Sequence, residues 1–418
     1  MSNPSRLLLS PADAMTKLAV LGGSSPFTAA FVDALAAAAH KLPPCALWLY
    51  GRNQQNLESL SRYGAAWLEP FSWSVNSTTT LQEALENAYI VIHQIRYGGL
   101  AGREEDERIA TEFGVAADET LGPGALHSIL RTISDLRCVS REIALAVPDA
   151  WVLNLTNPLS AVTAVMLECG VARCVGLCEL PRFTASQAAD LVGVPFEEVR
   201  WQYVGLNHRG FIVSLEHRGR DLLPELAHCL GENSIGGITA SQISDLGALP
   251  TKYFQIVCGR EHNPIGRAAF LSALRDQVAS ELLHDPATTP RSIRKRYMAW
   301  YSLSVVPMIV ALHSQEPSTE IVNVRRLNGL VEEVQANVSC KSIDAMPAPA
   351  INSPRVQRWI DDYRAHEEGV LRCIEDPSPA SIRGALLADP IAPRGCAKPM
   401  ADAIWRSYQN AINSGETQ

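Results

Sequence analysis

Four stretches of the sequence combine small, polar and charged residues directly after apolar runs. They are residues 94–99 with the downstream residues 103–108 and 118–124, then residues 154–158, 176–181 and 205–208. Ligands bind open α/β sheets at the carboxyl ends of the strands, so we expect these stretches to meet at one site. Two of them hold Cys178 and His208, residue types that bind divalent metals. The alternatives are that Cys178 is a small buried apolar residue and that His208 is a structural loop histidine.

A second candidate site is a glycine-containing turn after the first apolar run. Residues 18–21 lead into the sequence GGSSPFT, which an alanine-rich stretch follows. Glycines at such a turn let the backbone approach a pyrophosphate, whose charge then meets the N-terminal end of a helix. The spacing is not GxGxxG, so an ordinary tight turn is the alternative. The predicted cofactor contacts are Gly22, Gly23, Ser24, Ser25, Phe27 and Thr28.

The end of the second predicted strand bears on the choice of cofactor. An acidic residue that binds the ribose hydroxyls is usual there, but this chain has Gly51 followed by Arg52. The loss of a carboxylate and the gain of a guanidinium favour NADP, or a relaxed choice between NAD and NADP. The alternative is that Arg52 is a solvated loop residue.

The elements that would position these sites alternate along the first half of the chain. Strands are predicted at residues 17–21, 46–50, 89–93, 151–155 and 174–177. Helices are predicted between them, at residues 28–40, 53–64, 102–112, 126–145 and 158–168. Such alternation is typical of a parallel sheet covered by helices. We therefore expect an α/β fold, with a doubly wound, Rossmann-like domain that binds NAD or NADP over residues 15–200.

The pattern changes after about residue 198. Residues 199–206 and 211–216 alternate like antiparallel strands, and residues 217–220 resemble a turn. From residue 278 onward helical stretches dominate, and residues 302–312 are predicted to form a buried helix. We expect residues 201–418 to form a mixed α+β domain for catalysis, substrate binding and oligomerisation, which closes over the nicotinamide.

Composition limits the partners and the compartment. The 418 residues carry a formal charge of −8, and the one short basic run, residues 291–296, is too isolated to bind a nucleic-acid backbone. The apolar stretch at residues 302–312 is about half of the ~20 residues that a bilayer span needs. Ten cysteines without CxxC pairs fit reduced thiols. We predict a cytoplasmic protein without nucleic-acid or membrane partners.

Together, these segments resemble the NAD- and metal-dependent glycoside hydrolases of family 4, the group of 6-phospho-glucosidases, α-galactosidases and α-glucuronidases. Members show a GGGS turn, then Q-I-R-x-G-G, E-T-x-G-P-G, N-x-T-N-P, a cysteine followed by a polar residue, and G-L-N-H. Matching segments stand in the same order at residues 22–25, 94–99, 119–124, 154–158, 178–179 and 205–208. The resemblance is dense from residue 18 to 210 and implies a fold like that of lactate and malate dehydrogenases.

The resemblance implies a metal and a redox cofactor that take part in cleaving a glycosidic bond. Cys178 and His208 match the family's ligands for a divalent metal, usually Mn²⁺, and leave coordination positions open for two sugar hydroxyls. In the family, NAD takes a hydride from C3, and a base removes the acidified C2 proton. The C1 group then leaves, water adds and the hydride returns. This route is an exception to the two-carboxylate mechanism of glycosidases.

The family's base is a tyrosine in an L-P-x-x-Y segment, which matches Tyr253 in residues 249–253. A phenol has an ordinary pKa near ~10, so it needs a metal or a cationic neighbour to act near neutral pH. Lys252, Arg260 and Arg267 could supply that charge. The alternative is that Tyr253 is an interface aromatic.

Other positions concern the substrate. Glu179, beside the metal cysteine, matches a position that holds a proposed proton donor in members acting on α-linked substrates, which favours the α linkage. The candidate substrate contacts are Arg96, Glu119, Asn157, Asn207 and Arg267, with solvated or structural polar residues as the alternative. A cationic pocket around Arg96 or Arg267 would favour an anionic C6 group such as phosphate.

Several departures from the family pattern leave the sugar open. Ser24 replaces a glycine of the turn, Asp118 replaces a glutamine, Gly51 replaces the ribose acid, and the region after Tyr253 diverges. One alternative function is an NAD(P)-dependent 2-hydroxy acid dehydrogenase of the malate or lactate type, which gives the metal pair no role. Another is a non-catalytic Rossmann-fold sensor. We predict a small-molecule glycoside as partner and a homodimer or homotetramer.

Overall fold

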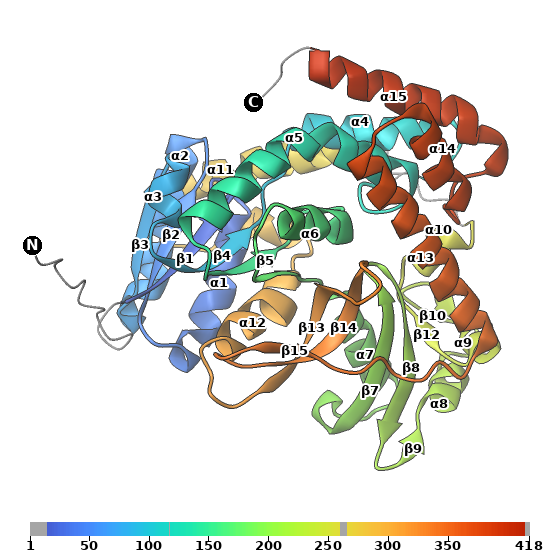
Figure 1. Cartoon of the computed structure of the whole chain (residues 1–418). Helices are drawn as coiled ribbons and strands as arrows, with labels where there is room; N and C mark the ends of the chain where they lie inside the picture. Colours follow the sequence, from blue (N-terminus) through green and yellow to red (C-terminus); the bar gives the residue numbers. More distant parts are fainter. Residues whose placement is uncertain (1–14, 117, 260–265, 414–418) are drawn as a thin grey trace, which may run out of the picture.

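A thirteen-stranded sheet runs through the molecule and organises the whole fold (Figure 1). The computed structural model describes residues 15–116, 118–259 and 266–413. The strand order is β12-β8-β7-β14-β13-β6-β5-β4-β1-β2-β3, with β9 paired to β8 and β15 paired to β14. Both halves of the chain therefore contribute strands to one sheet.

Strands of the first half form the parallel part of the sheet. They are β1 (Thr16–Leu21), β2 (Cys45–Tyr50), β3 (Ser74–Thr78), β4 (Ala88–His93), β5 (Trp151–Asn154) and β6 (Cys174–Gly176). Leu18 and Val20 of β1 face one hydrophobic core, whereas Ala19 and Leu21 face another. Successive side chains of a strand point to opposite faces, so both faces need cover. The predicted doubly wound α/β fold is confirmed.

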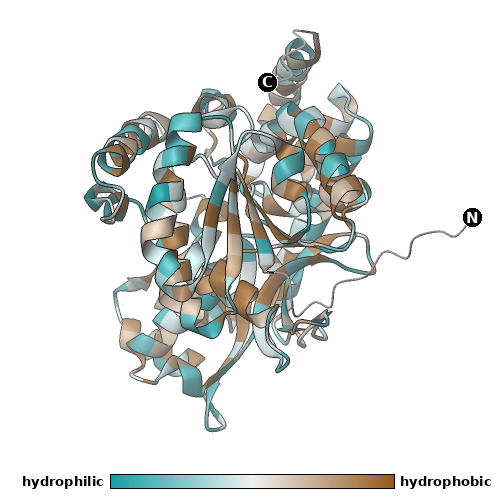
Figure 2. Ribbon diagram, turned by 90° about the vertical axis from the view of Figure 1, so that its left-hand side faces the viewer, coloured by the Kyte–Doolittle hydropathy of each residue, from teal (hydrophilic) through white to brown (hydrophobic). Residues whose placement is uncertain are grey.

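Helices supply that cover on both faces, and hydrophobic residues line the strands between them (Figure 2). One core includes α1 (Thr28–Ala38), α2 (Gln54–Leu68), α11 (Arg267–His284) and α12 (Val306–Ala311). The other includes α3 (Leu81–Leu85), α4 (Gly99–Glu112), α5 (Gly122–Ala146), α6 (Leu159–Glu168), α13 (Pro354–Glu375), α14 (Pro379–Ala388) and α15 (Ala397–Asn413). The C-terminal helices thus pack against the first half of the chain.

The antiparallel part begins with the predicted hairpin of β7 (Val199–Leu206) and β8 (Arg209–His217). The predicted turn after β8 is also confirmed, because Arg218 and Gly219 have φ of 51° and 80° before β9 (Arg220–Asp221). The hairpin shares a third core with several short elements. They include α7 (Leu180–Leu191), α8 (Leu223–Leu230), β10 (Ser234–Ile235), β11 (Ile238–Thr239), α9 (Ala240–Leu246), β12 (Leu249–Pro250) and α10 (Phe254–Val257).

The expectation of predominantly helical structure after residue 278 is wrong for residues 318–345. These form β13 (Ser318–Arg325), β14 (Val331–Val338) and β15 (Ile343–Ala345). The β13–β14 hairpin lies between β6 and β7, where Asn323 pairs with Gly176 and Glu333 with Gly205. Buried glutamates interrupt its apolar residues, which obscured the alternation that identifies a strand.

Other predicted boundaries differ less. Strand β3 was not predicted, and α5 begins at Gly122 instead of residue 126. The predicted buried helix at residues 302–312 is a π-helical turn, η5 (Tyr301–Val305), followed by α12. In the part of the chain that the structure describes, no helix has the length and apolarity that a membrane crossing requires.

Candidate active site

The glycine turn after β1 packs tightly between the ends of β2 and β4. The N–H groups of Gly22 and Gly23 donate to the carbonyl oxygen of Tyr50, at 3.1 and 2.7 Å. Gly22 has a φ of +90°, and a Cβ there would lie 2.8 Å from the carbonyl oxygen of Gln94. Only glycine suits this conformation in this space. The turn brings the start of α1 to the carboxyl edge of the parallel strands, where we expected a dinucleotide.

Two side chains of the turn serve its own structure. Thr28 is fully buried, and its hydroxyl accepts a hydrogen bond from Gln94 Nε2 at 3.2 Å, so this group supports the turn from inside. A Cβ at Gly51 would collide with the side chain of Ser24. The serine and the glycine therefore form a matched pair, and an acidic residue at position 51 would not fit beside this serine.

The remaining predicted cofactor residues lie around the same turn. Ser25 donates its N–H to the carbonyl oxygen of Gly22 at 3.3 Å, and Phe27 is buried directly before α1. Arg52 is exposed at the carboxyl end of β2, close enough for its charge to oppose the rise in the pKa of Asp135. This placement is compatible with an NADP contact, which stays a prediction.

His208 and Asn207 occupy the turn between β7 and β8, where His208 has a φ of +64°. Nδ1 of His208 lies 2.9 Å from Oγ1 of Thr120, and its carbonyl oxygen accepts a hydrogen bond from Thr251 at 3.1 Å. Burial and the charge of Lys252 lower the pKa of His208 to about 3. The imidazole is therefore neutral near pH 7 and keeps a lone pair for a metal. Because Thr120 engages Nδ1, Nε2 is the nitrogen suited to that role.

Cys178 lies between β6 and α7, buried beside Tyr253. Its Sγ is 3.8 Å from Oε2 of Glu179. Burial, together with the charges of Glu179 and Glu333, raises the pKa of the Cys178 thiol well above 9.0. The protein alone thus favours a neutral thiol, and a bound cation would favour the thiolate that coordinates it.

The donor set suits an ion that a substrate helps to hold. Among the described residues, no group of three or more His, Cys, Asp and Glu side chains is arranged to bind a metal. Tyr253 packs against the small cluster of Leu159, Cys178 and Leu180, and the ring of His208 stacks on Tyr253 with centroids 4.2 Å apart at 15°. A structural Zn²⁺ site would close its coordination shell with protein ligands. Two protein ligands instead leave positions for substrate oxygens, which fits the predicted divalent metal.

The pKa of Tyr253 differs from our expectation. Burial, followed by the charges of Asp118 and Cys178, raises the pKa of its phenol well above 10.0. The Nζ of Lys252 lies 5.2 Å from the centre of the ring, but it does not reverse this rise. The expectation that cationic side chains lower the pKa is therefore wrong for Lys252. A base at Tyr253 needs the added positive charge of a bound cation.

Glu179 has the properties of a proton donor. Burial raises the pKa of its carboxyl group, while Lys252 acts in the opposite direction. A raised pKa keeps the group protonated over a wider pH range, as general acid catalysis requires. Its position next to Cys178 places this proton beside the predicted metal site.

Two predicted substrate contacts, Arg96 and Glu119, form an ion pair with each other. Arg103 also binds Glu119 at 2.9 Å, and it binds Glu107 at 2.7 Å. Burial opposes ionisation of Glu119, but Arg96 and Arg103 hold its pKa below the ordinary value. The side chain of Arg96 is 37% exposed, so some of its donors remain open to a ligand.

Glu333 is a buried carboxylate that the sequence did not single out. It accepts hydrogen bonds from the Tyr203 hydroxyl at 2.6 Å, from Asn207 at 3.2 Å and from Asn323 at 3.0 Å. Burial raises the pKa of Glu333 from 4.5 to about 7. Because Asn207 precedes His208, this network ties the metal-site turn to the β13–β14 hairpin. Asn207, a predicted substrate contact, uses its amide for that bond.

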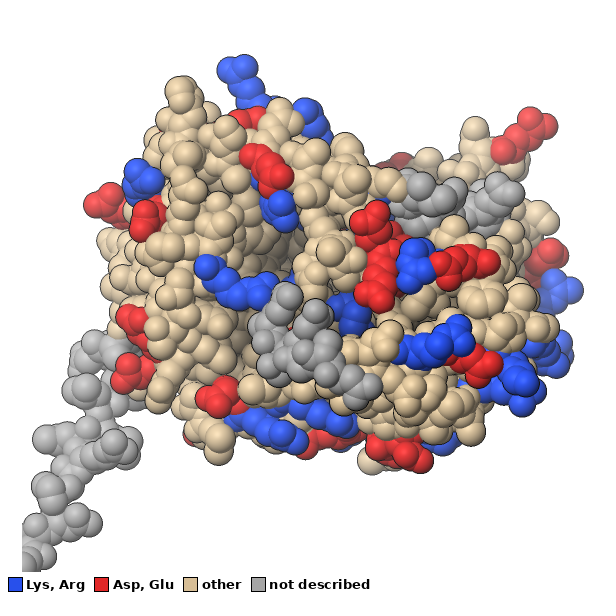
Figure 3. Space-filling model, turned by 90° about the horizontal axis from the view of Figure 1, so that it is seen from above, with Lys and Arg blue, Asp and Glu red and all other residues tan. Residues whose placement is uncertain are grey.

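Asn157 and Arg267, the other predicted substrate contacts, take no part in the Glu119 ion pairs or in the hydrogen bonds of Glu333 described above. Asn157 is half-buried just before α6. Arg267 is exposed at the first residue of α11, with its guanidinium 5.4 Å from the centre of the Phe270 ring. Arg260 lies outside the described residues. On the face seen in Figure 3, acidic and basic side chains are interspersed.

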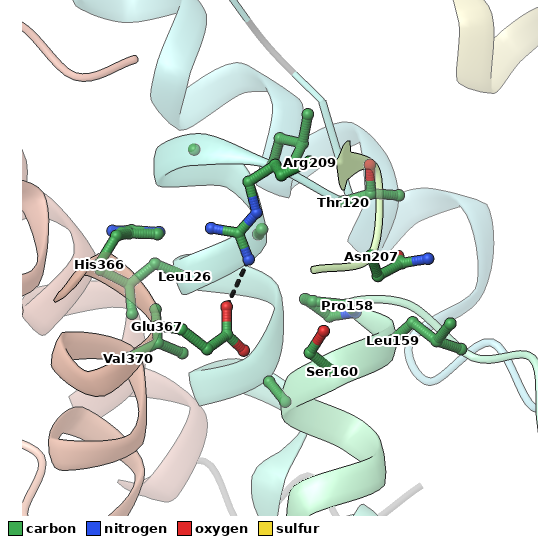
Figure 4. Close-up of a pocket in the computed structure, with 14 residues that line it drawn as sticks. Thr120, Leu126, Pro158, Leu159, Ser160, Asn207, Arg209, His366, Glu367 and Val370 are labelled. Carbon is green, nitrogen blue, oxygen red and sulfur yellow. Dashed lines mark hydrogen bonds and ion pairs between the residues drawn. The ribbon is translucent and has the colours of Figure 1, made fainter. Parts of the chain in front are cut away.

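A small cavity behind the His208 turn is too small to be the sugar site. Pro158 and Ser160 at the start of α6, Arg209 of β8 and Glu367 of α13 surround it, together with Asn207 of the β7–β8 turn (Figure 4). Its volume of about 20 Å³ suits one water molecule, whereas small-molecule pockets span roughly 300–1,000 Å³. An ion pair between Arg209 and Glu367 closes one side.

Comparisons with known proteins show which families and folds this chain resembles. The family model "Family 4 glycosyl hydrolase" matches residues 17–194, and the model of the C-terminal domain of that family matches residues 203–392. A 6-phospho-beta-glucosidase of Escherichia coli (strain K12) is 26% identical over 357 residues, which cover 78% of this chain and 79% of that protein.

Solved structures show the same fold. A 6-phospho-alpha-glucosidase from gut microorganisms, in complex with NAD and Mn²⁺, superposes with a TM-score of 0.82 at 20% identity, covering 96% of this chain and 99% of that one. Lactate dehydrogenase from Eimeria maxima superposes with a TM-score of 0.55 at 14% identity, covering 88% and 97%. The expected likeness to dehydrogenases is confirmed at the level of the fold.

Proposed function

Because the chain belongs to family 4 of the glycosyl hydrolases, as its sequence resemblance implied, we propose that it hydrolyses the O-glycosidic bond of a sugar with an anionic C6 group, such as a 6-phosphoglucoside. NAD, or NADP, and a divalent metal such as Mn²⁺ are its proposed cofactors. A relative and a structural neighbour named as 6-phospho-glucosidases, the latter with NAD and Mn²⁺, support this choice. No feature of the site favours the dehydrogenase alternative.

One observation carries the proposal: the convergence of four side chains with complementary properties. The His208 ring stacks on Tyr253, Tyr253 packs against the buried cluster that contains Cys178, and the Cys178 thiol faces Glu179. Cys178 and Glu179 lie between β6 and α7, His208 lies in the β7–β8 turn, and Tyr253 lies in the segment after β12. We propose that residues 15–200 hold the cofactor, and that residues 201–418 contribute His208 and the base.

The roles follow from the protonation states. When bound, the dinucleotide would accept and return a hydride at C3, and the metal would polarise the neighbouring sugar oxygens. Tyr253 removes the C2 proton once a bound cation has lowered the pKa of its phenol. Glu179, with its pKa raised by burial, donates a proton to the leaving group. Arg96 binds the anionic group at C6.

Hydrolysis of a nitrophenyl glucoside 6-phosphate in deuterated water tests the route. Removal of the C2 proton predicts product labelled at C2, whereas a two-carboxylate glycosidase leaves C2 unlabelled and needs no dinucleotide. Replacing Tyr253→Phe should lower turnover by roughly 10²–10⁴-fold with little change in substrate binding. Unlabelled product would overturn the mechanism, while a labelled product from a fully active Tyr253→Phe enzyme would move the base elsewhere.

The matched unphosphorylated nitrophenyl glucoside tests the substrate class. We expect kcat/KM to be at least ~10-fold lower without the phosphate, since a charge-assisted contact is lost. A cytoplasmic location and a homodimer or homotetramer complete the proposal. Light scattering of the purified chain measures the oligomeric state.

A further inference from the structure

Arg296 is a cation near both candidate sites, and no described residue serves as its anionic partner. It follows the short helix η4 (Arg291–Lys295), within the basic run at residues 291–296. Its guanidinium lies 4.5 Å from the ring centre of Phe27 and 5.3 Å from that of Trp300. Within the described residues, this side chain forms no ion pair and donates no hydrogen bond. A half-buried charge in this state is costly unless an anion neutralises it.

The described neighbours of Arg296 carry charges of both signs. Arg96 and Arg103 pair with two carboxylates, Glu107 and Glu119, and Asp118 also acts on Arg103. Burial and the nearby charge of Arg96 lower the pKa of Arg296 to about 10, so it still carries its charge near neutral pH. Of these three arginines, Arg296 is the one that forms no ion pair with a described residue.

The two aromatic contacts of Arg296 leave its N–H donors without an oxygen partner among the described residues. Aromatic rings contact the faces of a guanidinium, while its five N–H donors lie in its plane. Phe27 stands at the dinucleotide turn, directly before α1. The next residue, Tyr297, contacts Phe183 with the two rings tilted and their centroids 5.4 Å apart, and it lies within electrostatic range of Glu179. This segment thus runs from the dinucleotide turn to the proposed sugar site.

We propose that Arg296 binds a phosphate group between the dinucleotide turn and Arg96, as a specificity residue for the phosphate-bearing ligand. Its planar fork matches two oxygens of a phosphate. Two sources supply this chemistry: the pyrophosphate of the dinucleotide and the C6 phosphate of the sugar. The sugar source rests on the proposed function, whereas the dinucleotide source does not.

The test compares binding of NAD and of glucose 6-phosphate by calorimetry, the latter to protein saturated with NAD and Mn²⁺. Replacing Arg296→Met keeps an unbranched side chain between the rings and removes the charge. We expect binding of one of the two ligands to weaken by roughly 10–100-fold, the loss expected for a charge-assisted hydrogen bond. Arg296→Lys should recover part of that loss. The exposed neighbour Arg294 provides the control, because Arg294→Met should change neither constant more than about twofold.

The pattern of loss identifies the phosphate. Weaker binding of glucose 6-phosphate with unchanged binding of NAD indicates that Arg296 contacts the sugar phosphate. Weaker binding of NAD with unchanged binding of glucose 6-phosphate indicates that it contacts the pyrophosphate. If the folded Arg296→Met chain binds both NAD and glucose 6-phosphate with dissociation constants within about twofold of the wild type, the inference is overturned. Adenosine and glucose lack phosphate, so an equal loss of binding for these two compounds would overturn it as well. A wild-type chain that binds NAD but no glucose 6-phosphate would refute the proposed substrate class, and NAD binding would then decide the role of Arg296 alone.

Discussion

Replacing Glu333→Gln should make the protein less sensitive to rising pH. The folded carboxyl group has a pKa of about 7 because of burial, against 4.5 when it is solvated. Between these values the folded chain keeps a proton that the unfolded chain has released, so the free energy of unfolding falls as the pH rises. The wild type has its full stability below about pH 4.5 and loses this contribution by pH 7. At 1.36 kcal/mol per pKa unit, the loss is about 3 kcal/mol.

The glutamine retains the shape of the carboxyl group and is neutral at every pH. It can accept from Asn207 and Asn323 through its oxygen and donate to the Tyr203 hydroxyl, so the network survives. We expect the stability difference, variant minus wild type, to increase by about 2–3 kcal/mol from pH 5 to pH 8. Denaturant unfolding of metal-free protein with a chelator measures it, because the groups distant from Glu333 titrate alike in both chains.

A second substitution checks the same reasoning in the opposite direction. The Tyr203 hydroxyl donates to the carboxylate and lowers the pKa of Glu333. Tyr203→Phe should therefore make the decline in stability with pH steeper. A difference between Glu333→Gln and wild type that stays constant from pH 5 to pH 8 would refute the account of a buried, protonated Glu333.

Three further measurements address the metal, the cofactor and the fold. Cys178→Ser should weaken Mn²⁺ binding by at least ~10-fold in an electron paramagnetic resonance titration, and an unchanged constant would exclude the cysteine as a ligand. Arg52→Ala should weaken binding of NADP by roughly 10-fold and leave binding of NAD nearly unaffected. Equal effects on both cofactors would indicate that Arg52 is a solvated loop residue. Arg209→Met leaves the buried Glu367 unpaired and should destabilise the chain by about 3–5 kcal/mol, much of which the double variant with Glu367→Gln should restore.

The parallel half of the fold was predictable because its signals are local. Apolar runs in the sequence predicted five strands, namely β1, β2, β4, β5 and β6. The glycine turn after β1 can be recognised from its own residues, without knowledge of a distant partner. The family motifs then pointed to Cys178 and His208 as candidate metal ligands. The stacking of His208 on Tyr253 adds a geometry that spacing alone could not give.

The properties that the sequence did not reveal depend on contacts between distant segments. Glu333 becomes a buried acid only because β14 lies beside β7, which brings Asn207 within reach. The raised pKa of Tyr253 depends on its burial in the folded chain, and then on the charges of Asp118 and Cys178, from two other segments. In the sequence, Arg296 is one member of a short basic run. Only the fold shows that its guanidinium lies over the ring of Phe27.

The position of the β13–β14 hairpin has a consequence for synthesis of the chain. Strands β6 and β7 are complete by residue 206, but the hairpin that fills the space between them ends at Val338. A nascent chain shorter than that leaves each of these strands with an unpaired edge, which is a template for pairing with other chains. Such late, long-range closure slows folding and prolongs exposure to aggregation. The ribosome completes the β13–β14 hairpin, which pairs with both edges, only about 130 residues after the end of β7. We therefore expect the growing chain to need chaperones most during this interval.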